Sequence, residues 1–265
     1  MPETKQSGWT IHYETHGSRN NPAILMILGL SHRLPHWGKL AGLLAENLFV
    51  VTFDSRGMGL SERRDEPYTV QDEVQDVVAV MDAVGLDRAA VYGRSRGGML
   101  AQEVALSAPD RTAKLVLSGT SHRGPGAVGS TDAVNRAMNF TPNMTREQIF
   151  ETQNVAMAAP GWKERDPEAF GYLMQVDLEA PPRRFAVVHQ QEAMSNWSSF
   201  DRLGTIACPT LVICGEDDGM VPPENSRQIA AKIPDARLEL IPQCGHLPML
   251  EQPERVADLV LGFVS

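Results

Sequence analysis

The chain has 265 residues, with 24 Lys and Arg against 33 Asp and Glu, which gives a formal net charge of −9 at pH 7. This acidic balance argues against a nucleic-acid partner. No apolar run reaches the roughly eighteen residues of a membrane span, and the first residues lack the pattern of a signal peptide. Cys208, Cys214 and Cys244 are an odd number without metal-ligand spacing, which indicates a reducing compartment, so we expect a cytoplasmic protein.

Short apolar segments recur along the chain and predict strands. They cover residues 10–14, 23–28, 48–53, 89–92, 114–118, 210–214 and 237–241. Several are continuous apolar runs, as expected for parallel strands that are covered on both faces. Helical patterns lie between them: one follows the capping pair Thr69 and Asp72 and stops at Gly85, and the last begins at Pro253. This alternation predicts an α/β fold with a doubly wound, mostly parallel sheet.

The pentapeptide Gly93-Arg94-Ser95-Arg96-Gly97 joins the strand at 89–92 to a helical stretch at 98–108. In this context the two glycines keep side chains out of a turn in which the strand and helix backbones nearly touch. The serine is then held in a strained, exposed position known as a nucleophile elbow. We therefore predict that Ser95 is a nucleophile; the alternative is an ordinary strand-to-helix turn.

A serine hydroxyl requires a base to take its proton and a third group to hold that base. An acidic loop, Gly215-Glu216-Asp217-Asp218, follows the strand at 210–214, and His246 follows the strand at 237–241. The carboxyl ends of parallel strands meet at one edge of a sheet, so these groups can converge on Ser95. The chain order Ser, Asp, His belongs to one hydrolase architecture and not to the chymotrypsin or subtilisin types.

Four motifs in this order resemble the α/β-hydrolase superfamily over nearly the whole chain. They are the elbow, the segment Asp54-Ser55-Arg56-Gly57-Met58-Gly59-Leu60-Ser61, the acidic loop with Val221-Pro222, and Gly245-His246 with Glu251-Gln252-Pro253-Glu254. Within the superfamily the chain is similar to small, capped carboxylic-ester hydrolases and enol-lactonases such as 3-oxoadipate enol-lactonase. The scaffold segments that carry this likeness are 97–99, 101–102, 108–109, 111 and 114–117.

The resemblance assigns roles at the site. It implies Ser95 as the nucleophile, His246 as the base and Asp218, third after the glycine that closes the strand, as the acid. It also implies an oxyanion hole made by the backbone N–H groups of Leu30 and Arg96. One departure from the family pattern is Leu28-Gly29, where the family often has His-Gly. Leu28 lacks the polar side chain that often braces this loop.

The remaining histidines give no metal signal. His32 and His36 follow Gly29 closely enough to touch substrate, but neither is predicted as a site residue, and no pair of histidines has metal-ligand spacing. No cofactor or metal is therefore expected. The oligomeric state is open.

The alternation of strands and helices breaks between residues 121 and 200. This stretch contains short helical patterns at 146–157 and 168–175 and follows the sixth strand, where the resembled superfamily inserts a helical cap. We predict an α/β-hydrolase core at 1–120 and 201–265 and a helical cap at 121–200; the alternative is a helical excursion that pads the sheet. Its methionines, with Trp162 and Trp197, could line an adaptable pocket or pack the core.

The predicted function is a serine hydrolase that cleaves a small-molecule carboxylic ester or lactone through an acyl-enzyme. Other chemistry of the same triad stays open: a carbon–carbon bond hydrolase, an acyltransferase or a biosynthetic eliminase. Leu247 departs from the aromatic residue that usually follows the histidine in the carbon–carbon hydrolases. A hydrolase-fold protein that binds a ligand with negligible turnover is a further alternative.

Arg94 and Arg96 place unusual positive charge on both sides of Ser95 in an acidic protein. Either they are buried in ion pairs with carboxylates such as Asp54 or Glu103, or one of them faces the pocket and binds an electron-rich group of the substrate. The sequence favours the buried pairs.

Overall fold

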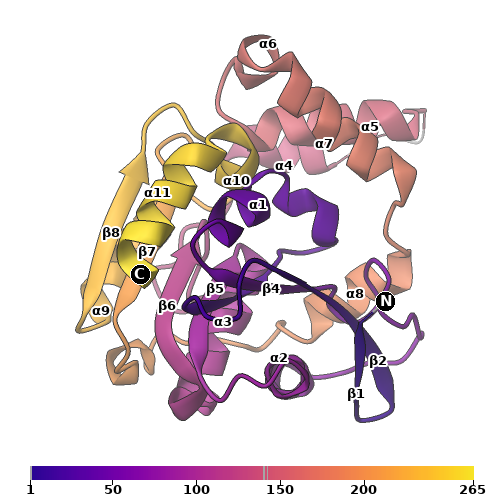
Figure 1. Cartoon of the computed structure of the whole chain (residues 1–265). Coiled ribbons are helices and arrows are strands. Elements are labelled where there is room, and N and C mark those ends of the chain that lie inside the picture. Colours follow the sequence, from indigo (N-terminus) through magenta and orange to yellow (C-terminus); the bar gives the residue numbers. More distant parts are fainter. Residues whose placement is uncertain (1, 140, 142) are drawn as a thin grey trace.

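A computed structural model describes residues 2–139, 141 and 143–265. Its centre is an eight-stranded sheet in the order β1-β2-β4-β3-β5-β6-β7-β8 (Figure 1). The strands are β1 (Glu3–Gln6), β2 (Trp9–His16), β3 (Ala23–Ile27), β4 (Phe49–Phe53), β5 (Ala89–Arg94), β6 (Thr112–Ser118), β7 (Thr210–Gly215) and β8 (Ala236–Ile241). β1 pairs with β2 and β2 with β4 in antiparallel fashion, and all other neighbours are parallel.

The seven strands expected from the sequence correspond to β2 through β8, and the predicted doubly wound, mostly parallel sheet is confirmed. β1 was not predicted from the sequence pattern. Its residues Glu3–Gln6 are all polar or charged and alternate between exposed and half-buried positions. They form a strand because β2 offers them a partner, not because they have an apolar face of their own.

Helices cover both faces of the sheet. They are α1 (Leu40–Ala45), α2 (Val70–Ala83), α3 (Arg96–Ser107), α9 (Pro223–Lys232), α10 (Pro248–Glu251) and α11 (Pro253–Val264), with short 3-10 turns η1 (Leu34–Trp37), η2 (Pro109–Arg111) and η3 (Leu203–Thr205). Val74 of α2, Leu100 of α3 and Ile229 of α9 share one buried cluster with one face of the strands. Leu40 of α1 and Val260 of α11 belong to the cluster on the other face.

The start of α2 follows the predicted pattern. The Asp72 N–H donates to Thr69 Oγ1 over 3.2 Å, and the Thr69 N–H donates to Asp72 Oδ2 over 2.8 Å, which satisfies two N–H groups at the helix start. Gly85, with φ of 73°, lies just past the helix end.

Among the described residues between β6 and β7, five α-helices precede η3: α4 (Asp132–Met138), α5 (Arg146–Met157), α6 (Trp162–Arg165), α7 (Pro167–Glu179) and α8 (Arg184–Glu192). In Figure 1, α5, α6 and α7 form the upper part of the molecule, and α8 lies lower, near the N-terminus. The helical patterns expected at 146–157 and 168–175 coincide with α5 and with part of α7. Residues 140 and 142 lie outside the described part, and the division into core and cap stays a prediction.

The large side chains of this insertion mostly pack. Trp162, Met194 and Trp197 are buried and belong to the two core clusters, so they stabilise the insertion against the sheet layers.

Across the part of the chain that the structure describes, no helix combines the length and apolar character needed to cross a membrane.

Candidate active site

Ser95 lies in the turn between β5 and α3, with φ of 55° and ψ of −121°. A non-glycine residue with positive φ is strained, and such strain persists where the surroundings enforce it. Here the enforcing contacts are backbone approaches. A Cβ on Gly93 would lie 2.2 Å from the carbonyl oxygen of Gly97, and one on Gly97 would lie 2.3 Å from the carbonyl oxygens of Ile27 and Leu28. Both positions therefore require glycine.

The side chains of Ser95, His246 and Asp218 form one hydrogen-bonded chain. Ser95 Oγ lies 3.0 Å from His246 Nε2, and His246 Nδ1 lies 2.8 Å from Asp218 Oδ2. A carboxylate only accepts hydrogen bonds, so Nδ1 carries the proton and Nε2 is free to accept from the serine hydroxyl. Residues from three loops, 151 and 28 positions apart in sequence, are thus brought into a proton-transfer geometry.

The acidic loop after β7 presents Asp218 and turns Asp217 outward. Asp218 is buried, and its Oδ1 accepts the N–H groups of Met220 at 3.0 Å and Val221 at 2.8 Å. Asp217 is exposed. Gly119, with φ of 51°, leaves room beside this contact, because a Cβ there would lie 3.1 Å from Asp218 Oδ2 and 3.3 Å from His246 Nδ1.

The environment of His246 favours the neutral ring. Burial lowers the pKa of the His246 imidazole below its usual value of 6.5, and the nearby charge of Arg94 acts in the same direction, against the opposing effect of Asp218. A buried ring with a lowered pKa keeps a lone pair at neutral pH, which a base requires.

The predicted oxyanion donors lie next to Ser95. Neither the Leu30 N–H nor the Arg96 N–H has a hydrogen-bond partner within residues 2–139, 141 and 143–265. A Cβ on Gly29 would lie only 3.1 Å from Ser95 Cβ, so the Gly29-Leu30 backbone lies directly against the serine. Arg96 is the first residue of α3, where free N–H groups and the helix dipole favour negative charge.

Gln190 of α8, which no sequence motif indicates, contacts both sides of this arrangement. Its Oε1 accepts the N–H of Ser31 at 2.9 Å, and its backbone carbonyl accepts Arg96 Nε at 2.8 Å. Ser31 has φ of 64° and follows Leu30 directly. Gln190 therefore holds the loop of Leu30 and the side chain of Arg96, the two residues whose backbone N–H groups are the predicted oxyanion donors.

The two arginines of the elbow have different surroundings. Arg96 is buried and forms a two-pronged ion pair with Glu73 of α2, with Nη1 at 2.9 Å from Oε1 and Nη2 at 2.5 Å from Oε2. The favoured interpretation, a buried pair, therefore holds for Arg96, but the suggested partners Asp54 and Glu103 are wrong. Asp54 accepts backbone N–H groups, and Glu103 binds Arg202.

Arg94 is buried without a carboxylate partner among the described residues. Its Nη2 donates to the carbonyl oxygen of His246 at 2.6 Å, and its Nη1 lies 3.0 Å from His32 Nδ1. For Arg94 the expectation of an ion pair is therefore wrong.

Glu251 of α10 holds the loop of His246 to the insertion. Its carboxylate accepts the N–H groups of Gly245 at 2.9 Å, Leu247 at 3.0 Å and Ala159 at 2.8 Å. The His246 N–H also donates to the carbonyl oxygen of Met157, the last residue of α5, at 2.7 Å. The histidine loop is thus fixed from both the α/β core and the insertion.

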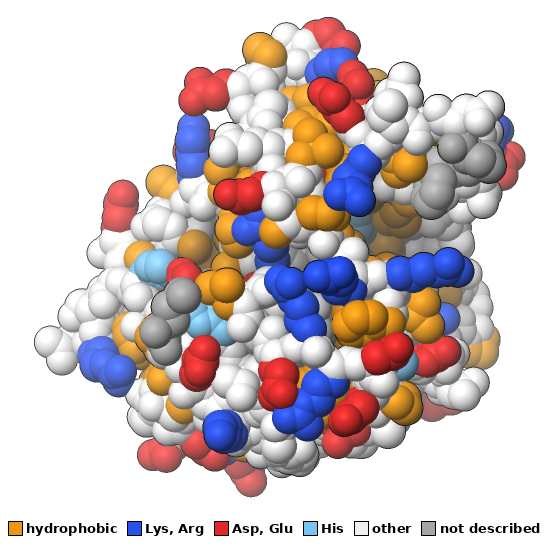
Figure 2. Space-filling view, turned by 90° about the vertical axis from the view of Figure 1, so that its right-hand side faces the viewer, with side chains coloured by type: hydrophobic (Ala, Val, Ile, Leu, Met, Phe, Trp, Pro, Cys, Tyr) orange, Lys and Arg blue, Asp and Glu red, His pale blue; other side chains and the backbone are white. Residues whose placement is uncertain are grey.

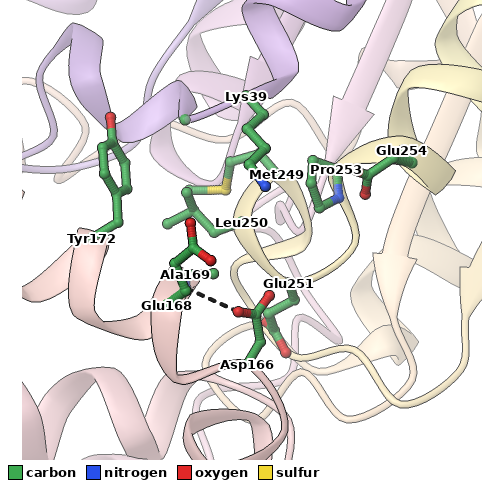
Figure 3. A pocket seen from close by; sticks show the side chains of 11 residues that line it. Lys39, Asp166, Glu168, Ala169, Tyr172, Met249, Leu250, Glu251, Pro253 and Glu254 are labelled. Atoms are coloured by element: carbon green, nitrogen blue, oxygen red, sulfur yellow. Dashed lines mark hydrogen bonds between the residues drawn. The ribbon is translucent and has the colours of Figure 1, made fainter.

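A cavity of about 380 Å³ lies beside this loop, between α7, α10 and the start of α11. Glu251 lines it, and Ser95 does not. Figure 3 shows that Glu168 and Tyr172 of α7, with Asp166 just before it, and Glu251 of α10 line this cavity, together with Lys39. On the face shown in Figure 2, the surface is hollowed between the upper helical part and the rest of the molecule, with Lys and Arg side chains along the rim.

No three His, Cys, Asp or Glu side chains within the described residues are grouped as metal ligands would be.

The fold and the elbow identify the class of protein. A family model described as the alpha/beta hydrolase family matches residues 16–259, so the chain belongs to this family. The match supports hydrolase activity, and the more specific relatives are diverse.

A putative carbamate hydrolase, RutD, of Caulobacter segnis is 30% identical over 260 residues, with 96% of each chain covered. The 3-oxoadipate enol-lactonase 2 of Acinetobacter baylyi is 24% identical over 244 residues, with 92% of this chain and 89% of the relative covered. Among solved structures, an enol-lactonase from Burkholderia xenovorans LB400 superposes with a TM-score of 0.85 at 25% identity and 99% coverage of both chains. The chain is thus similar to enol-lactonases.

Proposed function

We propose that this protein is a serine hydrolase that cleaves a carboxylic ester or lactone of a small molecule through an acyl-enzyme. The observation that carries the proposal is the hydrogen-bonded chain from Ser95 through His246 to Asp218, with the serine on a strained turn. The family match and the likeness to enol-lactonases support it.

In the proposed mechanism Ser95 Oγ attacks the substrate carbonyl while His246 Nε2 takes the hydroxyl proton. Asp218 orients the ring and stabilises the imidazolium that forms. The N–H groups of Leu30 and Arg96 donate to the tetrahedral oxyanion. His246 then protonates the leaving alcohol, and after the alcohol departs it activates water to release the acid.

We further propose that the helices of residues 121–200 act as a cap that shapes the substrate site. The contacts that support this are the bonds from the insertion to the histidine loop and from Gln190 to Ser31. Substrate size and shape would then depend on this segment more than on the sheet.

The first prediction concerns Ser95 itself. A fluorophosphonate should add one label at Ser95, and Ser95→Ala should lose nearly all hydrolysis of p-nitrophenyl acetate, because no other residue would supply the nucleophile. Mass spectrometry of the labelled peptide and initial-rate assays measure both. Full activity in Ser95→Ala would eliminate the serine mechanism.

A second candidate reaction is the hydrolysis of a carbamate, which the match to the putative carbamate hydrolase favours. The same serine attack on a carbamate carbonyl would give a carbamoyl-enzyme. A higher kcat/KM for a carbamate than for an ester of the same alcohol would favour this reaction over ester or lactone cleavage.

A further inference from the structure

Arg94 is a buried cation that touches no carboxylate among the described residues; burial lowers the pKa of its guanidinium, and the more distant charges of Asp218 and Glu251 oppose this effect. Its side chain is 2% exposed, and no Asp or Glu oxygen within the described residues forms an ion pair with it. Nε has no hydrogen-bond partner there either. Taking a charge out of water costs several kcal/mol when no opposite charge compensates it. The contacts that Arg94 does make, with His32 and His246, therefore call for a role.

The contact with His32 fixes the state of that ring. A guanidinium group has donors and no acceptor, so His32 Nδ1, at 3.0 Å from Arg94 Nη1, must accept. A histidine ring whose Nδ1 accepts is neutral and carries its proton on Nε2. Burial lowers the pKa of His32 well below 6.5, and the charges of His36, Arg94 and His246 act in the same direction. The His36 ring stacks on it in parallel, with centroids 4.2 Å apart.

The opposite edge of the ring is free. Nε2 of His32 has no hydrogen-bond partner among the described residues, and it is absent from their buried, unpartnered polar atoms, so it reaches open space. The loop that carries the ring is tight, because the His32 N–H donates to the carbonyl oxygen of Gly29 at 3.4 Å. His32 lies two residues after Leu30, in the loop whose Gly29 lies against Ser95.

We propose that Arg94 holds His32 as a neutral hydrogen-bond donor, and that His32 Nε2–H binds a second oxygen atom of the substrate, beyond the carbonyl oxygen that reacts. This inference rests on the proposed ester or lactone hydrolysis. A neutral donor suits an uncharged acceptor, such as an ether, hydroxyl or ring oxygen close to the reacting group. His32 would then select oxygen-bearing substrates over hydrocarbon analogues of the same shape.

The ring state is tested on the unmodified protein by nitrogen-15 NMR after histidine-selective labelling, with His32→Gln to identify the signal. The result expected is a neutral ring with its proton on Nε2 from pH 5 to pH 8. A proton on Nδ1, or a charged ring at pH 6, would overturn the proposal. Arg94→Met should release this restraint and allow both tautomers.

Substrate selection is tested with pairs that differ by one oxygen for one methylene: p-nitrophenyl methoxyacetate against p-nitrophenyl butyrate, and 2-methoxyethyl acetate against butyl acetate. The kcat/KM ratio of the two esters in a pair is compared between variants, so the difference in intrinsic reactivity between the two esters cancels. His32→Met, which has no donor, should lower the ratio about tenfold in one pair, because one hydrogen bond is lost. His32→Gln, which keeps an N–H donor, should retain most of it.

His16→Met and His16→Gln, on the exposed end of β2, are the matched controls and should leave both ratios unchanged. Equal ratios in all His32 variants would overturn the donor role. Fluorophosphonate labelling of Ser95 separates this result from failure of the proposed function. If Ser95 is not labelled and no ester turns over, 2-methoxyethyl acetate and, as the control, butyl acetate are titrated into the nitrogen-15-labelled protein. An Nε2–H signal that does not move with 2-methoxyethyl acetate, or that moves equally with both esters, rejects the donor role independently.

Discussion

At the scale of single residues, the two neighbouring carboxylates of the acidic loop make a sharp test. Asp218 binds His246, whereas Asp217 is exposed. Asp218→Asn should therefore lower kcat by a factor of roughly 10⁴, the size of effect seen when a triad acid is neutralised. Asp217→Asn should leave kcat within a few-fold of the unmodified protein. Steady-state assays of both variants on one ester give the comparison, and a larger loss for Asp217→Asn would move the acid by one residue.

The pair of Arg96 and Glu73 predicts a structural effect. Arg96→Met leaves the Glu73 carboxylate buried and uncompensated, which should cost about 3 to 5 kcal/mol of stability. Anionic and neutral esters should lose activity equally, because the guanidinium binds Glu73 and not substrate. Urea unfolding and kcat/KM for both ester classes measure these effects. The double variant with Glu73→Gln should recover part of the stability, and a selective rise in KM for anionic esters would contradict this assignment.

Among elements, α8 contacts the loop of Leu30, one of the two proposed oxyanion donors, through Gln190. Gln190→Leu removes the acceptor for the Ser31 N–H, so the Leu30 loop can shift. We expect kcat to fall tenfold or more with little change in KM, because the loss would be felt in the transition state. Gln190→Glu keeps the acceptor and serves as the control. Equal kcat in the Leu and Glu variants would show that the bond to Ser31 does not position the loop.

The sequence predicted the helices, strands and local motifs better than the contacts between side chains that are distant in the chain. The sequence could indicate that Ser95, Asp218 and His246 converge, because each lies in a local motif at the end of an apolar strand, and the structure places the three side chains in one hydrogen-bonded chain; their catalytic roles stay a prediction. The partner of Arg96 could not be predicted, because Glu73 lies 23 residues earlier on a helix, and only the packing of α2 against α3 brings the two together. Gln190 carried no signal, since one glutamine in a helix looks like any surface residue.

For the whole molecule, Glu103 connects separate parts of the chain. Burial alone would raise the pKa of its carboxyl, but bonds from Arg202, Trp197, Ser107 and Gln71 outweigh burial and lower the pKa from 4.5 to about 2. A depressed folded-state pKa stabilises the protein above the unfolded value, and this contribution disappears as the pH falls from about 4.5 toward 2. The stability of the fold should therefore fall over that range.

Glu103→Gln tests this at the same scale. At pH 7 the variant should lose about 2 kcal/mol, since hydrogen bonds to a charged group are stronger than those to a neutral amide. The difference from the unmodified protein should shrink as the pH falls below about 4.5. Urea unfolding at a series of pH values measures both. A difference that does not depend on pH would show that the loss comes from packing and not from the charge.

The contacts of Glu251 restrict how this protein can be recombined with its relatives. A segment exchange that replaces residues 121–200 also replaces Ala159, whose N–H binds Glu251, and Met157, whose carbonyl oxygen binds the His246 N–H. A foreign segment that does not place a backbone N–H and a carbonyl oxygen at these two positions would leave the histidine loop without these bonds, even if every residue of the Ser95, His246 and Asp218 chain were kept. If the insertion shapes the substrate site as proposed, substitutions within its helices would therefore preserve the histidine loop better than an exchange of the whole insertion.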